Sequence, residues 1–557
     1  MRKSLLTTMI LLAAFSVSFA KNIEDDAVYK SIYKSYTLNA DGSTDYRERK
    51  ELEVITNMAF DYFGETFIDY NPDFQKLTIN EAYVIRKDGT KVETPQNAFN
   101  PMLPSSCTGC ERLNAIRTMV VTHTALENNA TIVLDYTIHS DNFFFSGLFE
   151  TVSLCESAPV EKYTISVSVP EDRPLNWDVN FGSVQNSRQQ FSKENMKTVV
   201  WEFASLPAKS SELYLFRSAQ PAMSFYSADF AEDFINTFTQ QAAFNMSGHK
   251  EIKDFFVKLT DGVSSNRDRI IAVRDYISTN ISTKNANQKL LNRLLATPEH
   301  VWTTNCALPI EKEILLSRAL RELGYDAWVV FDDRKLSGNN CALVCATVGL
   351  DTLYISAAEA DELDMRATLA PTTLIFENGR IQRIGSIATE IEVVADIKFP
   401  NGNVKEPRTA VLTKKIKSPL TKTLSRQDTV VARPRVSEAG GLYVIEIDNG
   451  KYGTQVSSVE IYRDRKTDIN TRESAERYVY NIEIPEGYEA ITKPFREEIE
   501  VEGAKLLEEV NVAGRKVSIT RVLELPKNGV SGKSARKFKE MMGRWETPKR
   551  IVIRKSL

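Results

Sequence analysis

Two long blocks of alternating apolar and polar residues, separated by a block with helical periodicity, constrain the fold of this chain most strongly. From Ala27 to about Pro207, segments such as "TIVLDYTIHS" and "YTISVSVP" alternate as half-buried strands do. The segment "YVIRKDGTKVET" places Asp88 and Gly89 between two strand-like runs, which predicts a hairpin with a type I′ turn. The first block therefore predicts an antiparallel β-sandwich.

The second alternating block begins at Glu390 and includes "EIEVVADIKF", "RYVYNIEIP" and the last strand "RIVIRK". A second β-sandwich is the simplest architecture for these residues. One helix is predicted late in this block, from Ser534 to Trp545. Its apolar side chains repeat on a single face and are Phe538, Met541, Met542 and Trp545.

The middle block predicts a compact α+β unit that ends near Ile384. Helical patterns cover residues 230–245 and 251–259, and Ser265 then stands at the start of a further helix in capping-box spacing with Asp268. In "VWTTNCALPIEKEILLSRALRELGYDAWVVF", Pro309 suits the first position of a helix and Gly324 its end. Short strands are expected to follow this helix.

The N-terminus predicts an exported protein. Arg2 and Lys3 precede an apolar stretch, and small residues at Ser18 and Ala20 fit a signal-peptide cleavage site before Lys21. No later stretch approaches the 18 apolar residues of a membrane-spanning helix, so no integral membrane segment is expected in the mature chain. We expect a periplasmic location, with the outer surface as an alternative, in a Gram-negative bacterium.

The length and charge of the chain limit its organisation and its partners. With 557 residues, two to four domains are expected. A formal net charge of −4 does not favour nucleic acid as a partner, and the basic stretch 527–557 is interpreted as a solvated face rather than a binding patch. No nucleotide-binding or zinc-protease motif is present, so no cofactor or metal is expected.

Six cysteines in an exported chain make local disulfides possible. Cys107 and Cys110 form a C-x-x-C pair in a polar loop, for which a small structural disulfide is favoured over free thiols and over catalysis or metal binding. The run "NFFFSGLFE" is interpreted as a buried stretch, with an exposed binding patch as the alternative. That patch would consist of Phe143, Phe144, Phe145 and Phe149.

The order of the three blocks, together with "VIRKDGTKVET", "SAPVEKYTISVSVP", "AVRDYISTNI" and "LLSRALRELGYDAWVV", resembles exported bacterial transglutaminase-like proteins. Their N- and C-terminal β-domains are of unknown function. The resemblance covers essentially the whole mature chain. It implies a papain-like arrangement, in which a Cys at a helix start is activated by a His and an Asp on the following strands.

This chain departs from that arrangement at all three positions. The residues that match the expected Cys, His and Asp are Pro309, Cys341 and Ser356. The four histidines of the chain all precede Cys306, so the ordered Cys–His arrangement is absent from the sequence. Cys306 and His300 remain weak candidates for a nucleophile and a base. We therefore expect no catalytic triad.

A disulfide between Cys306 and Cys341 across the former active site is one hypothesis that follows from the resemblance. The alternative is that Cys341 and Cys345 are ordinary buried thiols on one strand. Cys341 and Cys345 cannot bond to each other, because four strand residues separate them by about 13 Å.

The sequence thus predicts a signal peptide (1–20), a β-sandwich domain (21–220), a transglutaminase-like α+β domain (221–389) and a second β-sandwich (390–557). The expected function is a non-catalytic one, in which the chain binds an envelope protein or peptide or acts as a scaffold. The alternative is a cysteine-dependent peptidase or acyltransferase that uses Cys306 with an unconventional base.

Overall fold

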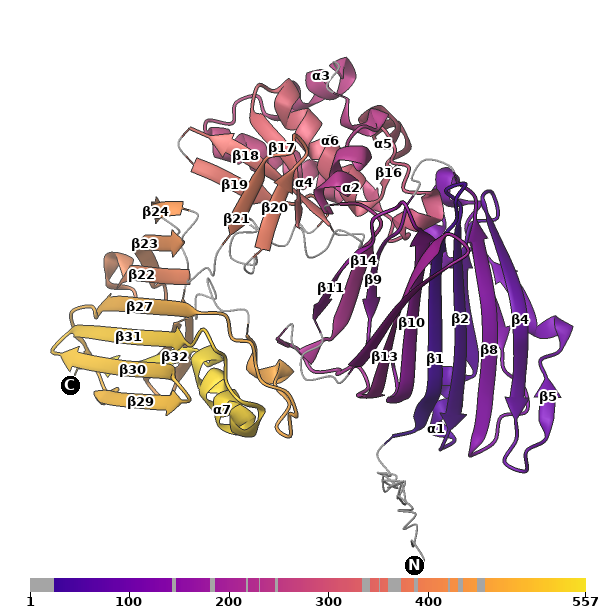
Figure 1. Ribbon diagram of the computed structural model, residues 1–557. Coiled ribbons are helices and arrows are strands. Elements are labelled where there is room, and N and C mark those ends of the chain that lie inside the picture. Colours follow the sequence, from indigo (N-terminus) through magenta and orange to yellow (C-terminus); the bar gives the residue numbers. More distant parts are fainter. Residues whose placement is uncertain are drawn as a thin grey trace, which may run out of the picture.

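The computed structural model shows a multidomain, strand-rich chain with several separate sheets (Figure 1). Within the described residues, no helix is long and apolar enough to cross a membrane. The structure describes residues 25–142, 147–180, 186–216, 219–229, 231–245, 249–332, 341–349, 351–358, 372–384, 389–418, 421–428, 434–447 and 456–556.

The N-terminal part is built on an eight-stranded sheet. Only the neighbours β1 and β10 are parallel in this sheet, and the other neighbouring pairs are antiparallel. The strands in spatial order are β12 (Asn186–Lys193), β13 (Met196–Leu206), β10 (Val160–Pro170), β1 (Ala27–Leu38), β2 (Thr44–Val54), β8 (Ala130–Ser140), β4 (Gln75–Ile85) and β5 (Lys91–Glu93).

The predicted hairpin forms between β4 and β5, but its turn differs from the predicted type. Gly89 has a positive φ of 85° and Asp88 does not, whereas a type I′ turn needs both. The Gly89 N–H donates to Arg86 O, and the Arg86 N–H donates to Thr90 O. The connection is therefore a type I turn followed by a glycine in the left-handed region.

Two three-stranded sheets pack on one face of the eight-stranded sheet. One consists of β11 (Asn176–Asn180), β14 (Ala222–Tyr226) and β9 (Phe149–Ser153), and the other of β3 (Glu65–Tyr70), β7 (Arg117–Thr122) and β6 (Phe99–Met102). Phe225 of β14 shares a hydrophobic core with Tyr163 of β10, and Val121 of β7 shares one with Leu134 of β8. A short helix, α1 (Met58–Phe63), completes this part. Strand β14 follows the predicted boundary at residue 220, yet it pairs with N-terminal strands.

In the middle part, helices pack beside a five-stranded sheet (Figure 1). The helices are α2 (Ala231–Phe238), α3 (Lys250–Leu259), α4 (Asn266–Asn280), α5 (Pro298–Thr304) and α6 (Pro309–Glu322). The sheet contains β19 (Asp351–Ile355), β18 (Ala342–Val348), β17 (Asp326–Asp332), β20 (Thr372–Phe376) and β21 (Ile381–Ile384). Residues 309–320 of α6 are all buried, so this helix forms the centre of the part.

The predicted start of α4 and the predicted ends of α6 are confirmed, whereas the helix predicted over residues 230–245 already ends at Phe238. The hydroxyl of Ser265 accepts the Asp268 N–H at 3.0 Å at the start of α4. Pro309 occupies the first turn of α6, and Gly324, with a φ of 87°, follows its last turn. Local residue preferences therefore fix where the central helix begins and ends.

The C-terminal part contains a seven-stranded and a four-stranded sheet. The late helix, α7 (Ala535–Glu546), buries Phe538, Met541, Met542 and Trp545 against them, as the sequence predicts. The larger sheet consists of β24 (Thr421–Asp428), β23 (Arg408–Ser418), β22 (Thr389–Lys398), β27 (Ser474–Glu483), β31 (Lys516–Leu525), β30 (Ala504–Ala513) and β29 (Phe495–Val501). The smaller sheet consists of β25 (Arg435–Ala439), β26 (Leu442–Ile447), β32 (Lys549–Lys555) and β28 (Tyr488–Ala490).

The segment that follows β13 contacts the C-terminal part, although the middle part lies between them in sequence. The carboxylate of Glu212 accepts the backbone N–H groups of Lys466 and Thr467 at 2.7 and 3.0 Å. The hydroxyl of Tyr214 accepts the Ser457 N–H at 3.0 Å. These contacts connect the N-terminal and C-terminal parts directly.

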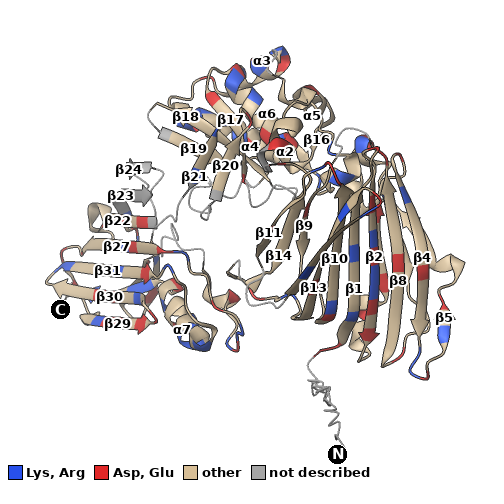
Figure 2. Cartoon of the chain, viewed as in Figure 1, with Lys and Arg blue, Asp and Glu red and all other residues tan. Residues whose placement is uncertain are grey.

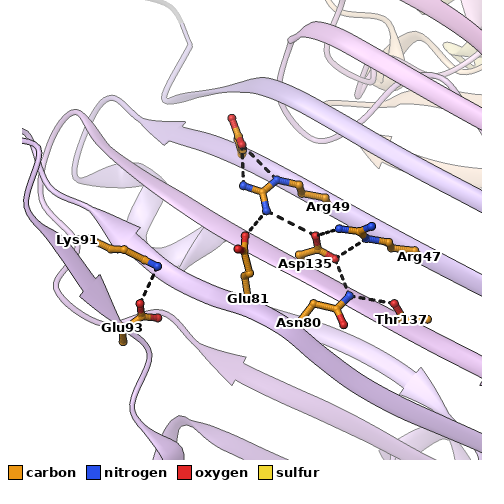
Figure 3. Close-up of polar contacts among 9 residues, drawn as sticks. Arg47, Arg49, Asn80, Glu81, Lys91, Glu93, Asp135 and Thr137 are labelled. Carbon is orange, nitrogen blue, oxygen red and sulfur yellow. Dashed lines mark hydrogen bonds and ion pairs between the residues drawn. The ribbon is translucent and has the colours of Figure 1, made fainter.

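Charged residues of both signs are mixed along β2, whereas the neighbouring β8 carries a single one, Asp135 (Figure 2). On the face shown in Figure 3, Asp135 of β8 is only 1% exposed. It accepts two hydrogen bonds from Arg47, at 3.0 and 2.6 Å, and one from Asn80 at 2.8 Å. Burial by itself raises the pKa of Asp135, but the bonds from Arg47 and Asn80 outweigh it and hold the pKa below its usual value.

We predict that Asp135→Asn lowers the free energy of unfolding by about 1–3 kcal/mol. The substitution removes a buried negative charge that Arg47, Arg49 and the side-chain amide of Asn80 satisfy. The folded-state pKa is lowered, so this advantage of the wild type is present at neutral pH and disappears as the pH falls through the folded-state pKa. Urea unfolding at pH 7 and pH 3 measures it. Glu93→Gln is the control, since Glu93 pairs with Lys91 in solvent and its loss should change little. An equal effect of the two substitutions would contradict the prediction.

Candidate functional site

The candidate site lies at the start of the central helix α6, where the resemblance places a catalytic thiol. Cys306 belongs to a two-residue strand, β16 (Cys306–Ala307), which pairs with β15 (Ser282–Thr283). Leu308 caps α6 and Pro309 begins it. The Sγ of Cys306 is bonded to the Sγ of Cys110, 196 residues earlier in the chain. Both cysteines are buried.

This disulfide corrects both predicted pairings. Cys107 is not bonded to Cys110, and Cys341 is not bonded to Cys306, so each of these two predicted disulfides is absent. All four cysteines belong to one hydrophobic cluster, which the loop after β6 and the elements around α6 form together. Tertiary packing within that cluster decides the pairing, and the distance along the sequence does not. Cys345 is buried and free, in agreement with the alternative prediction for it.

Polar contacts reinforce the disulfide on both sides. The guanidinium of Arg112, two residues after Cys110, pairs with the buried carboxylate of Glu311 in the first turn of α6. Glu311 also accepts the Leu308 and Ala296 N–H groups, each at 2.8 Å. The ammonium of Lys284 donates to Thr108 O at 2.7 Å. We call the Cys110–Cys306 bond, the Arg112–Glu311 pair and the Lys284–Thr108 bond the junction.

The junction changes the electrostatics of the helix start. Backbone N–H groups give the first turn of a helix a partial positive charge, which in a thiol enzyme stabilises the thiolate. Here the carboxylate of Glu311 accepts the Leu308 N–H and supplies negative charge at that position. The sulfur of Cys306 is already in a covalent bond. The site therefore serves as a structural contact between two parts of the chain.

No histidine contacts Cys306 or Cys341 in the part of the chain that the structure describes. His300 is exposed on α5, where its N–H donates to the hydroxyl of Thr297. The ring of His249 pairs with Glu299, that of His139 with Asp45, and that of His123 with Thr66. The hydrogen bonds and ion pairs of the four histidines therefore go to groups other than Cys306 and Cys341.

The two strand positions of the degenerate triad are both buried. Cys341 precedes β18, and Gln288 Nε2 donates to its Sγ at 3.8 Å. Ser356 follows β19, and its hydroxyl donates to Glu313 of α6 at 2.6 Å. Glu313 also accepts the N–H groups of Ala357 and Ala358. Sequence reasoning missed Glu313, because nothing in the helical pattern distinguishes it from the neighbouring charged residues Glu311 and Lys312.

Burial also affects the neighbouring Lys312. It lowers the pKa of the Lys312 ammonium to about 8, while the charge of Glu313 acts in the opposite direction. The ammonium donates to Ser278 O at 3.0 Å. The buried charges of α6 thus have hydrogen-bonding partners, which is the usual condition for charges inside a protein.

The proposed aromatic patch receives no support from Phe149. This residue is 7% exposed and stacks on Phe234, with ring centroids 4.2 Å apart. It belongs to the same cluster as Cys306, so it is a core residue. Phe143, Phe144 and Phe145 lie outside the described residues. Within the described residues, no group of three or more His, Cys, Asp or Glu side chains is arranged to hold a metal ion.

Comparison with known proteins assigns two stretches of the chain to described domains. Residues 40–210 match the model of a domain of unknown function with a solved structure (DUF3857). Residues 451–553 match the model of a second domain of this kind (DUF3858). No curated protein matches the chain.

The fold is similar to that of a crystal structure of a "putative protease" from Parabacteroides distasonis. The likeness covers 95% of this chain and 99% of the other, with a TM-score of 0.72 and 24% sequence identity, and it shows a shared fold. A "putative cysteine protease" from Cytophaga hutchinsonii aligns over 52% of this chain and 95% of its own, with 10% identity and a TM-score of 0.20. An M1 zinc metallopeptidase from Deinococcus radiodurans aligns over 36% of this chain and 42% of its own, with 10% identity and a TM-score of 0.21. Nothing is inferred from the last two.

We predict that loss of the disulfide loosens the junction. Cys110→Ser and Cys306→Ser should each lower the free energy of opening there by about 2–5 kcal/mol, the usual contribution of a native disulfide. Hydrogen exchange of the amides of residues 104–116 and of the first turn of α6 measures this. Cys107→Ala is the control, because it leaves the disulfide intact. Equal protection in all three variants would show that the disulfide does not hold these segments together.

We also predict a pH effect from His123. Burial lowers the pKa of His123 to about 4. Between about pH 6.5 and pH 4 the unfolded chain binds a proton at this residue, and the folded chain does not. The free energy of unfolding therefore decreases as the pH is lowered through this range. Urea unfolding at pH 7 and pH 4.5 should show that wild type loses about 2–3 kcal/mol more than His123→Gln. An identical loss in the two proteins would contradict this assignment.

Proposed function

We propose that this chain is an exported, non-catalytic, transglutaminase-like binding protein of the cell envelope. The observation that carries the proposal is the bond between Cys306 and Cys110, because it commits the Cys306 sulfur at the start of α6 to a structural crosslink. An enzyme built on Cys306 would need this bond reduced and a base supplied, and no histidine contacts either Cys306 or Cys341 in the described part of the chain.

The disulfide also supports the proposal of export. Disulfides persist in oxidising compartments such as the periplasm and are rare in the cytosol. The N-terminal signal-peptide pattern at residues 1–20 leads to the same compartment. Peptides or proteins of the envelope are the proposed ligands. The proposed organisation is a β-sandwich up to about residue 220, a transglutaminase-like unit to 389 and a second β-sandwich after it.

Timed alkylation of the non-reduced protein at pH 6–7, followed by peptide mass spectrometry, tests whether Cys306 has a thiol function. We expect Cys306 and Cys110 to remain unlabelled, since neither carries a free thiol. An activated thiolate would instead label quickly at a pH where ordinary thiols, with pKa values near 8.5, react slowly.

An activity assay completes this test. The wild type, with and without reductant, and Cys306→Ser should hydrolyse a protein substrate such as casein equally poorly. Rapid labelling of Cys306, or hydrolysis that depends on Cys306, would overturn the proposed non-catalytic function.

A further inference from the structure

A cavity of about 530 Å³ lies between the N-terminal sheets and the middle part. Its walls come from β1, β2 and β8 on one side, from β3 and β9 on another, and from the connection at residues 287–293. Protein interiors contain few voids larger than a water molecule, and small-ligand sites typically have volumes of roughly 300–1,000 Å³. Cys306 does not line this cavity. The cavity is therefore a candidate ligand site of its own.

Three tyrosines form the wall that the eight-stranded sheet contributes. Tyr36 of β1 stands opposite Tyr46 of β2, and Tyr136 of β8 stands opposite Glu48, two residues farther along β2. Residues two apart on a strand share a face, so all four side chains lie on the inner face of the sheet. The ring centroids of Tyr36 and Tyr46 are 5.0 Å apart, and those of Tyr46 and Tyr136 are 6.0 Å apart. The rings therefore form a continuous aromatic surface beside the cavity.

The hydroxyl of Tyr36 is available to a ligand. It forms no hydrogen bond with any residue that the structure describes, and it is not sealed from solvent, so it opens on the cavity. The hydroxyl of Tyr136, by contrast, donates to Glu48. Burial raises the pKa of Tyr36 well above its ordinary value, so its hydroxyl stays protonated. A protonated hydroxyl both donates and accepts hydrogen bonds.

The charged side chains on the inner side of the cavity neutralise one another. Lys34 lies 3.0 Å from Glu156 and 3.4 Å from Glu48, and Lys289 pairs with Glu150. Burial by itself lowers the pKa of Lys34, but the charges of Glu48 and Glu156 outweigh it and raise the pKa, so the ammonium is charged. A charged ligand would bring a further charge without a counterion into this enclosed place, which is costly.

The other charged residues at the cavity are directed elsewhere. The guanidinium of Arg293 donates to a backbone carbonyl group of β9 at 2.9 Å. The carboxylates of Asp45 and Asp141 meet at the ring of His139, on the face of the sheet opposite to the tyrosines. The carboxylate of Asp69 lies on the outer face of β3. The cavity therefore favours a neutral ligand.

The two ion pairs still have hydrogen-bonding capacity for such a ligand. A carboxylate accepts several hydrogen bonds and an ammonium donates several, so each pair offers acceptors and donors side by side. Hydroxyl groups of a ligand match this arrangement, because they too both donate and accept. The faces of the tyrosine rings carry partial negative charge and attract C–H groups next to oxygen atoms, which are slightly positive. A saccharide has many hydroxyl groups and C–H faces of this kind.

We propose that the cavity binds a short neutral saccharide, with a C–H face of a sugar ring against Tyr36 and Tyr46 and sugar hydroxyl groups at the Tyr36 hydroxyl and the two ion pairs. A peptide fits this wall less well, because extended peptides pair with the free edge of a sheet. Strands β1, β2 and β8 have neighbours on both sides and offer no edge. The inference goes beyond the proposed protein or peptide ligand and does not depend on the state of Cys306.

Isothermal titration calorimetry with the full, non-reduced chain tests this proposal. The neutral probes are maltose, cellobiose and N,N′-diacetylchitobiose. Chitobiose is the cationic control, cellobiouronic acid the anionic control, and N-acetyl-Gly-Ala-Gly-amide the neutral peptide. We expect at least one neutral saccharide to bind, with an affinity that changes little with salt, because no net charge is involved. The charged saccharides should bind at least tenfold more weakly than the best neutral one, and the peptide should not bind.

Variants connect the binding to the cavity. Tyr36→Phe removes the hydroxyl but keeps the ring, and it should weaken binding of the best neutral saccharide at least fivefold. Lys289→Met removes a donor from the middle part and should weaken it as well. Tyr33→Phe is the matched control, because Tyr33 lies on the opposite face of β1 and does not line the cavity. Thermal unfolding checks that the variants are folded.

Several results would overturn the proposal. They are the absence of binding by every neutral saccharide, equal binding of a charged saccharide, and binding of the peptide in place of the saccharides. Wild-type binding by both Tyr36→Phe and Lys289→Met, or an equal loss in Tyr33→Phe, would place any saccharide outside this cavity and would also overturn it.

Discussion

The covalent bond between Cys110 and Cys306 is the interaction on which the organisation of this chain depends most. It joins a loop of the N-terminal part to the start of the most buried helix of the middle part. The Arg112–Glu311 ion pair and the Lys284–Thr108 hydrogen bond lie beside it and act in the same direction. A crosslink between residues so distant in sequence removes many conformations from the unfolded chain.

The same bond withdraws the Cys306 sulfur from any reaction that requires a free thiol. Thiol catalysis needs a free sulfur, a base and a group that orients the base. At the corresponding places this chain has a disulfide, a buried cysteine beside Gln288, and a serine bonded to Glu313. Each group has a structural partner. The buried polar groups around α6 therefore stabilise the middle part and its contact with the N-terminal part.

Local features of the structure follow from the sequence, whereas contacts between distant segments do not. The start of α4 at Ser265 and the buried face of α7 depend on neighbouring residues, so their patterns were sufficient. The hairpin at Asp88 was predicted, but its turn type depends on register, which the sequence does not show. The partner of Cys306 and the pairing of β14 depend on how separate elements meet, and no local pattern records that. The absence of a histidine after Cys306 was readable directly and remains the best sequence signal about the site.

Peptide mapping of the non-reduced protein tests the central claim most directly. The protein is alkylated, digested without reductant and analysed by mass spectrometry. We expect one linked pair of peptides that contains Cys110 and Cys306, together with alkylated Cys107 and Cys341. Recovery of a Cys107–Cys110 disulfide together with alkylated Cys306 would contradict it, because Cys306 would then be a free thiol at the start of α6.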